Sequence, residues 1–324
     1  MADVLVSDTA RAAQRIVDNV ERVIAGNTAA VRAAVVCLLS EGNLLLEGVP
    51  GVGKTMLARA VARSIGGDFH RVQATPDLLP SDLTGISVYD QDRHAFTFVP
   101  GPIFANVVLV DEVNRTTPRT QSALLEPMEE RQATIEGVTH RLPEPFFLVA
   151  TENPAEHHGT YPLPEGQLDR FAMAVRVEYP EWVQAREVVT RQLVRHPIDV
   201  LEPIMEPADV VRHQHVVRSV HVETAVIDYA LGLVEATRAH PDVALGASPR
   251  SAVALTRCSQ ALAAASGRDF VLPDDVKALA ADVLGHRLIA GSRRETGSRA
   301  GREIVGELLE ELPVPLGLAG RSQA

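Results

Sequence analysis

Residues 48–55 read GVPGVGKT, which has the spacing of a loop that holds a nucleotide triphosphate. Its glycines allow a tight turn in which several backbone N–H groups converge on phosphate oxygens. The side chain of Lys54 can then reach the outer phosphates, and the hydroxyl of Thr55 can bind Mg²⁺. We expect ATP contacts from Gly48, Pro50, Gly51, Val52, Gly53, Lys54, Thr55 and Met56.

Two adjacent carboxylates follow a second apolar run, which reads VVLVDEVNR at residues 107–115. Asp111 suits the magnesium shell, and Glu112 suits a general base that polarises the attacking water. These roles need neighbouring carboxylates at a strand end that faces the phosphates. The pattern is weak alone, because any strand can end in acidic residues, but its place downstream of the phosphate loop strengthens it.

A third apolar run ends in polar residues and reads FFLVATENP at residues 146–154. Asn153 could hydrogen-bond the attacking water or the terminal phosphate. The alternative is a turn residue before Pro154, a position that asparagine favours in many proteins. This segment alone leaves both interpretations open.

The phosphate loop requires a strand before it and a helix after it. The apolar run at residues 44–47 predicts the strand, and apolar residues recur at helical spacing after Lys54. Further strands are predicted at residues 107–110, 146–150 and 174–177, with a weaker candidate at 69–72. Helical patterns separate several of these runs. The sequence therefore predicts an α/β fold with a parallel sheet and helices on both faces.

The other predicted elements are helical. Ser7 or Asp8 can cap a first helix that runs to about Val23, and a second helix covers residues 29–39. Strand signals stop near residue 180, and helices are predicted at 182–195, 208–217, 223–240, 249–265 and 273–290. We expect a nucleotide-binding core at residues 1–180, an all-helical domain at 181–290, and a polar, glycine-rich tail at 291–324 with a short helix at 303–309.

The composition restricts the possible partners. The 324 residues carry a net charge of −11, which opposes broad attraction to nucleic acid. No run of 18 apolar residues predicts a membrane span, and the N-terminus turns polar too soon for a signal peptide. Two cysteines, Cys37 and Cys258, are expected to be buried free thiols of a cytoplasmic protein. His157 and His158 suggest a metal site, but a polar loop is the simpler interpretation.

Taken together, the motifs resemble those of MoxR-family AAA+ ATPases over nearly the whole chain. The segments that carry the resemblance are GVPGVGKT, DEVNRTTP, QSALLEPMEE, ATENP, YPLPEGQLDRF and GASPR. The resemblance implies an αβα P-loop core, a small helical lid, ATP and Mg²⁺ as ligands, and assembly into a ring, commonly a hexamer. It also implies a chaperone-like role in which ATP drives the remodelling or maturation of other proteins, often with partners that carry a von Willebrand factor A domain.

The same resemblance assigns roles to single residues. Asn153 corresponds to sensor 1, Arg170 to the arginine finger that acts on ATP of a neighbouring subunit, and Arg250 to sensor 2, which reaches from the lid to the phosphates. Ile24 and Gly26 lie where such proteins cover the adenine base. An alternative for Arg170 is a local ion pair with Asp169. Arg250 begins a helix, where a positive charge is unfavourable unless an anion lies nearby, and this favours its proposed role.

Two β-hairpins are predicted at residues 86–99 and 133–142 from short alternating arms around polar or Glu-Gly centres. In the family they correspond to the helix-2 insert and the pre-sensor-1 hairpin, which tend to face the ring pore. We expect Ile86, Val88, Phe96 and Phe98 to pack one hairpin face onto the core. The alternative is that both hairpins are surface decoration.

Four functions remain in view. A protein-remodelling ATPase is favoured. A nucleic-acid motor of the helicase-related type shares the core motifs, but the acidic charge and the lack of a basic or aromatic stripe oppose it. A nucleotide-binding scaffold without turnover is opposed by Glu112, Asn153 and Arg170. A motor subunit for metal insertion, as in magnesium chelatase, would need a tetrapyrrole-binding partner.

Overall fold

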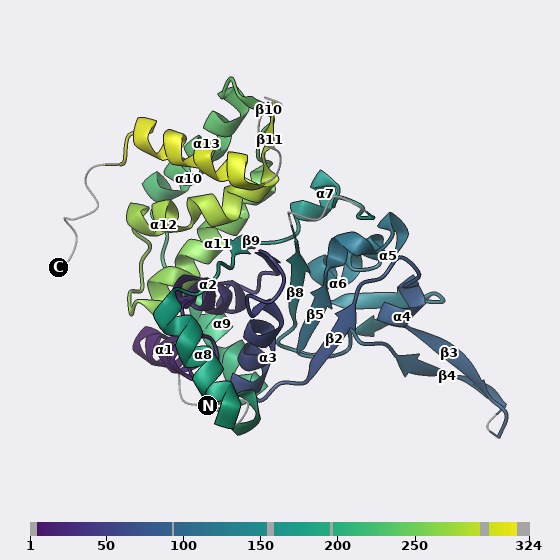
Figure 1. Ribbon diagram of the computed structural model, residues 1–324. Coiled ribbons are helices and arrows are strands. Elements are labelled where there is room, and N and C mark those ends of the chain that lie inside the picture. The colour runs from purple at the N-terminus through teal and green to yellow at the C-terminus, as the bar shows by residue number, and fades with distance from the viewer. Residues whose placement is uncertain (1–4, 93, 154–158, 195–196, 292–297, 316–324) are drawn as a thin grey trace.

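A five-stranded parallel sheet forms the centre of the molecule (Figure 1). The computed structural model describes residues 5–92, 94–153, 159–194, 197–291 and 298–315. The strand order is β2-β5-β8-β1-β9, with bounds β1 (Leu44–Glu47), β2 (Phe69–Gln73), β5 (Val107–Asp111), β8 (Phe147–Glu152) and β9 (Met173–Arg176). Every strand predicted for the sheet is present, and the weak candidate at residues 69–72 is the edge strand β2.

Both faces of the sheet are covered, which explains the continuous apolar runs. Successive residues of a strand point to opposite faces. Leu44 and Leu46 join one apolar core, whereas Leu45 joins the other. The first core includes α1 (Val6–Glu21), α2 (Thr28–Leu39) and α3 (Lys54–Ser64); the second includes residues of α4 (Pro80–Thr84) and α6 (Leu125–Glu130). The remaining helices of this half are α5 (Pro118–Ser122), α7 (Glu165–Leu168) and the 3-10 helix Val113–Arg115.

Helix α1 begins earlier than the predicted cap. Leu5 is the residue before the helix, and its backbone N–H donates to the carboxylate of Asp8 at 3.2 Å. Asp8 therefore stabilises the helix start from inside the first turn rather than as the cap residue. The helix ends at Glu21, slightly before the predicted end.

The two predicted hairpins are present, as β3 (Gly85–Asp90) with β4 (Ala95–Pro100) and as β6 (Gln132–Ile135) with β7 (Val138–Arg141). In Figure 1 the β3–β4 hairpin extends from the body as a long arm. The second hairpin turns through Glu136 and Gly137, both with positive φ. This conformation fits a two-residue turn between twisted strands.

The predicted packing of the first hairpin is wrong. Residues directly opposite each other in an antiparallel pair share a face. Tyr89 lies opposite Phe96 and Val88 lies opposite Thr97, so Val88 and Phe96 point to different faces. Phe96 is 72% exposed and Ile86 is 50% exposed. Phe98 has aromatic neighbours, its ring centroid lying 5.4 Å from that of Phe104 and 4.1 Å from that of His140.

The C-terminal part is mainly helical, as predicted. Its helices are α8 (Trp182–Val194), α9 (Pro207–Ser219), α10 (Thr224–Ala239), α11 (Pro249–Ala265), α12 (Pro273–Leu284) and α13 (Ser298–Glu311), with 3-10 helices Pro197–Val200 and Gly285–Arg287. It also contains a short antiparallel pair that the sequence did not suggest, β10 (Val243–Leu245) and β11 (Ile289–Ala290). The fifth predicted helix is shorter than expected: α12 stops at Leu284, and the 3-10 helix Gly285–Arg287 and β11 take up the rest of its predicted range.

Helix α13 is longer than the short helix expected in a polar tail, and it is packed. Ile304, Val305 and Leu308 lie in the same apolar core as the other C-terminal helices. A Cβ atom on Gly301 would lie 2.0 Å from the carbonyl oxygen of Gly285, so the two backbones touch. Glycine at this position indicates close packing rather than a flexible segment.

The C-terminal helices rest on the first two helices of the chain. In α9, the Nδ1 atom of His213 lies 3.0 Å from the Thr9 hydroxyl, and the side-chain amide of Gln214 donates to the Leu38 carbonyl at 2.8 Å. Cys37 and Cys258 are both buried free thiols, as expected. Among the described residues, no helix has the length and apolar character needed to cross a membrane.

Candidate functional site

Three of the predicted motifs meet at the carboxyl edge of the sheet. The phosphate loop follows β1, Asp111 ends β5 with Glu112 next, and Asn153 follows β8. Because the strands are parallel and β8 lies between β5 and β1, Asn153 lies between the loop and the acidic pair. Asn153 is buried. Ligands of open parallel sheets bind at this edge.

The phosphate loop has the backbone conformation that its glycines predict. Gly53 has φ 97° and forms the residue before α3, a conformation that disfavours other residues. A Cβ atom on Gly48 would lie 2.4 Å from the carbonyl oxygen of Val177, so a side chain has no room there. The ammonium of Lys54 donates to the carbonyl oxygens of Gly48 and Glu152, the latter at 3.0 Å. Phosphate oxygens are acceptors of the same kind, so the loop fits a triphosphate.

Asp111 receives hydrogen bonds from three side chains. The Thr55 hydroxyl donates to Oδ2 at 3.2 Å, and the Thr151 hydroxyl donates to Oδ1 at 2.6 Å. Nε and Nη2 of Arg71 donate to Oδ2 at 3.1 and 2.6 Å. Thr55 and Asp111 thus bring a hydroxyl and a carboxylate together, which are oxygen ligands that Mg²⁺ prefers when nucleotide phosphates supply the others. These residues fit the expected metal.

No all-protein metal centre occurs among the residues that the structure describes, in the sense of three or more clustered His, Cys, Asp or Glu side chains. His157 and His158 lie outside the described residues.

Glu112 has an unusual backbone conformation, with φ 57° and ψ 50°. This left-handed region costs a residue with a side chain about 1–2 kcal/mol. Neighbouring groups hold it in place: its N–H donates to the Thr151 hydroxyl at 2.8 Å, and its carboxylate accepts from Gln73 at 3.1 Å and from Arg115 at 2.9 Å. Such local strain is typical of residues with a chemical role.

The segment expected at the adenine base lies beside the loop. The side chain of Ile24 is buried, and its Cδ1 atom is 3.8 Å from the point that a Cβ of Gly53 would occupy. A Cβ on Gly26, which has φ 80°, would lie 3.1 Å from Pro180. Of the other loop residues, Val52 is buried, Met56 is half-buried and Pro50 is exposed. An adenine contact stays a prediction.

The structure does not bring Arg170 and Arg250 to the phosphate loop of their own chain. Arg170 precedes β9, and its carbonyl accepts from Asn43, the residue before β1, at 3.3 Å. Both positions mark the amino edge of the sheet. A four-residue strand such as β1 spans about 13 Å, so this edge and the phosphate loop are at opposite ends of the sheet.

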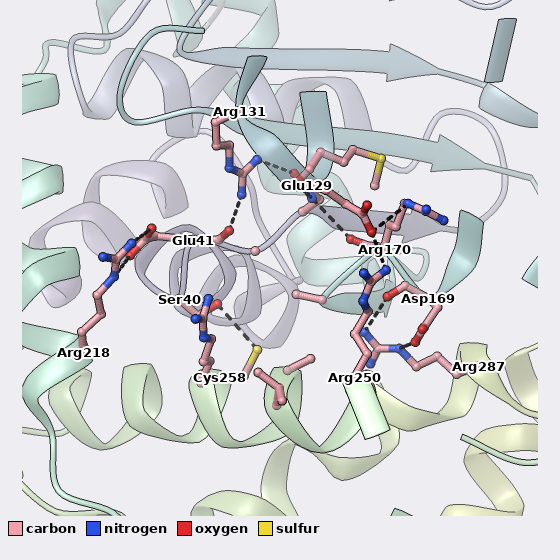
Figure 2. A pocket seen from close by; sticks show the side chains of 17 residues that line it. Ser40, Glu41, Glu129, Arg131, Asp169, Arg170, Arg218, Arg250, Cys258 and Arg287 are labelled. Atoms are coloured by element: carbon pink, nitrogen blue, oxygen red, sulfur yellow. Dashed lines mark hydrogen bonds and ion pairs between the residues drawn. The ribbon is translucent and has the colours of Figure 1, made fainter. Parts of the chain in front are cut away.

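At that amino edge the two arginines lie together in a cavity of about 450 Å³ (Figure 2). Nε of Arg170 is 3.0 Å from Oε1 of Glu129, and Arg250 pairs with the same oxygen. Asp169 does not serve as the local partner considered for Arg170. It pairs instead with Arg287 at 3.0 Å and accepts from the Ser248 hydroxyl at 2.9 Å.

Sequence reasoning missed several residues that surround the predicted ones: Arg71, Gln73, Arg115, Glu129 and Thr151. A signal existed for two of them. Arg71 and Gln73 are two apart in the edge strand β2, so they lie on one face beside the carboxylates of β5. Glu129 gave no comparable signal, because its partners are remote in the sequence.

A half-buried carboxylate beside the loop leads to a pH prediction. Desolvation of the carboxylate, reinforced by the nearby Glu47 carboxylate and opposed by Lys54, raises the pKa of Glu152 from 4.5 to about 7. The folded protein then binds this proton more tightly than the unfolded chain, so stability is lost as pH rises from about 4.5 through 7. We expect Glu152→Gln to raise the free energy of unfolding by about 3 kcal/mol at pH 8 and by little near pH 4.5.

Urea unfolding at both pH values measures this difference. The exposed Glu165 provides the matched control, because Glu165→Gln removes the same charge without relieving burial. If the free energy of unfolding rose with the same pH dependence in both variants, Glu152 would not be the source of the pH-dependent loss of stability.

Two parts of the chain match models of known protein families. Residues 43–173 match the model of the ATPase family associated with various cellular activities (AAA), and residues 235–308 match an AAA lid domain. The first match contains the phosphate loop, the acidic pair and Arg170. The second contains Arg250 and most of α13.

Several relatives match nearly the whole chain. Bacillus subtilis YeaC is 45% identical and the match covers 93% of this chain and 94% of YeaC. Chaperone MoxR1 of Mycobacterium tuberculosis is 42% identical over 85% of this chain and 75% of that protein. Protein MoxR of Methylorubrum extorquens is 30% identical over 88% and 90%. A crystal structure of a candidate ATPase from Cytophaga hutchinsonii aligns with a TM-score of 0.86 at 35% identity, covering 95% and 96% of the two chains.

Proposed function

Because the chain belongs to the MoxR family of AAA+ ATPases, we propose that it is an ATP-hydrolysing ring subunit that remodels, matures or assembles other proteins. One observation carries the proposal. The phosphate loop, Asp111 and Glu112 lie at one edge of the sheet, whereas Arg170 and Arg250 lie at the other. A second copy of the chain is needed to bring both sets together, as in a closed ring.

In this proposal each edge supplies part of the chemistry. The phosphate loop and Lys54 hold the triphosphate, and Thr55 and Asp111 hold Mg²⁺, which neutralises charge on the phosphates. Glu112 accepts a proton from the attacking water, and Asn153 orients that water or the terminal phosphate. Arg170 and Arg250 of the adjacent subunit stabilise the charge that develops during transfer. Hydrolysis is thereby linked to the relative position of two subunits.

The proposed oligomeric state, location and partner follow from the family resemblance. We propose a homohexameric ring in the cytoplasm and a chaperone-like activity, a description that the name of the Mycobacterium tuberculosis relative carries. A partner with a von Willebrand factor A domain is part of the proposal, on the family resemblance. None of the three relatives named above is described as a nucleic-acid motor or a metal-insertion subunit, so neither alternative gains support.

The β3–β4 hairpin is our candidate for contact with client proteins. It extends from the body, and Tyr89 and Phe96 form an exposed edge-to-face pair with ring centroids 5.4 Å apart. Neither side chain touches a phosphate motif. Replacing both with serine in the otherwise unaltered protein should leave the ATPase rate within about twofold. The same replacement in a Glu112→Gln variant, which is expected to hold ATP, should lower the amount of client protein retained.

Quantitative mass spectrometry of co-purified proteins, measured beside the ATPase rate, makes this comparison. Thr97→Ser is the matched control, since Thr97 is exposed on the other face of the same hairpin. If the double variant retained as much client protein as the protein with Tyr89 and Phe96, the hairpin would not be a client-binding element. Several-fold stimulation of the ATPase by DNA or RNA at physiological salt would favour the nucleic-acid motor instead.

A further inference from the structure

A single carboxylate joins the two arginines of the amino edge (Figure 2). Glu129 lies on α6, Arg170 precedes β9, and Arg250 is the second residue of α11. The Oε1 atom of Glu129 is 3.0 Å from Nε of Arg170 and also pairs with Nη1 of Arg250. The contact therefore links the sheet domain to the helical domain through charge.

Glu129 is the carboxylate that serves both of these arginines. Six arginines and three carboxylates line the described cavity. Asp169 is paired with Arg287, and Glu41 is paired with Arg218. Glu129 therefore provides the negative charge between Arg170 and Arg250, whose guanidinium groups would otherwise repel each other at this distance. The sequence had indicated that Arg250, at a helix start, requires an anion nearby.

A carboxylate and a terminal phosphate offer guanidinium groups the same chemistry, namely negatively charged oxygen acceptors. The two arginines are also accessible enough for a phosphate to replace the Glu129 carboxylate as their partner. The side chains of Glu129, Arg170 and Arg250 are 30%, 23% and 51% exposed, so solvent and a second subunit can reach them.

We propose that Glu129 is a positioning residue that takes the place of the neighbour's terminal phosphate in the unassembled subunit. It holds Arg170 and Arg250 in place, and it releases them when two subunits close around ATP. This inference rests on the proposed function, because it requires a nucleotide shared between copies. The exchange makes Glu129 a brake on ATP-driven assembly, since two ion pairs are lost before phosphate contacts replace them.

The test uses Glu112→Gln protein, which we expect to bind ATP without hydrolysing it. We compare it with versions that also carry Glu129→Gln or Glu130→Gln, and measure the subunit concentration at half-assembly by sedimentation velocity, with MgATP and without nucleotide. Partly exposed ion pairs of this kind change an equilibrium by small factors. Glu129→Gln should lower the midpoint about three- to tenfold with MgATP and should not lower it without nucleotide.

Glu130→Gln is the matched control because Glu130 lies on the same helix, carries the same charge and accepts a hydrogen bond from Gln132 at 3.1 Å. An unchanged or higher midpoint for Glu129→Gln overturns the inference, as does an equal fall in both variants. Glu129→Asp, which keeps the charge and shortens the reach, should lower the midpoint less than Glu129→Gln and separates loss of the pairs from misfolding.

Failure of the proposed function has a different signature. If Glu112→Gln protein stays monomeric with MgATP at all concentrations, the proposed ring assembly is wrong, and so is the role of Glu129 that depends on it. If rings form equally well with and without the Glu129 charge, this inference alone is wrong.

Discussion

Arg170→Ala should lower the rate of ATP hydrolysis by about 10³-fold or more, the usual worth of an arginine supplied by a neighbouring subunit. ATP binding to the altered chain should be unchanged, because Arg170 lies at the opposite edge of the sheet from its own phosphate loop. The rate of phosphate release and the affinity for a fluorescent ATP analogue measure the two quantities separately. Arg212→Ala, which removes an exposed arginine on α9, should leave both unchanged.

Mixing two inactive variants tests whether the arginine acts between subunits. Lys54→Ala protein lacks a working phosphate loop but carries an intact Arg170. In mixed rings, an intact Lys54 of one chain can meet an intact Arg170 of the next, so part of the activity should return. Mixtures that co-assemble without any recovery would show that Arg170 does not act across the interface.

Glu112→Gln should reduce turnover by about 10²–10⁴-fold while ATP binding persists, because the substitution removes the proton acceptor and leaves the phosphate loop intact. The amide has nearly the same size and can still contact Gln73, which donates to the Glu112 carboxylate at 3.1 Å. Single-turnover measurements with a saturating protein concentration isolate this chemical step.

Two other variants serve as controls for the effect of Glu112→Gln on ATP binding and turnover. Lys54→Ala should lose binding as well as turnover, and Glu130→Gln should lose neither, since Glu130 lies on α6 away from the phosphate loop. Hydrolysis by Glu112→Gln at a rate near that of the unaltered protein would assign the base to another residue.

The parts of the fold that the sequence predicted are those with local signals. Continuous apolar runs predicted the strands, because both faces of a parallel sheet are buried. The glycines and Lys54 predicted a strand–loop–helix unit, and the structure has it. Asp111 and Glu112 became candidates for the site because both lie at the end of such a run.

What escaped prediction depends on contacts between remote segments. The hairpin faces depend on strand register, which pairs Tyr89 with Phe96 and was not fixed by the alternation of either arm alone. The composition predicts a polar tail around Gly301, whereas this glycine allows α13 to touch Gly285. Glu129 was part of a family motif, but only the three-dimensional structure shows that it lies between Arg170 and Arg250.

The division of the site between two edges of the sheet also has a genetic consequence. A chain that lacks Arg170 but still folds, binds ATP and assembles would occupy a place in the ring and disable the site of the chain beside it. Alleles of this kind should be dominant over the wild-type allele when both are expressed in one cell. Alleles that prevent folding should be recessive, because their products never enter a ring.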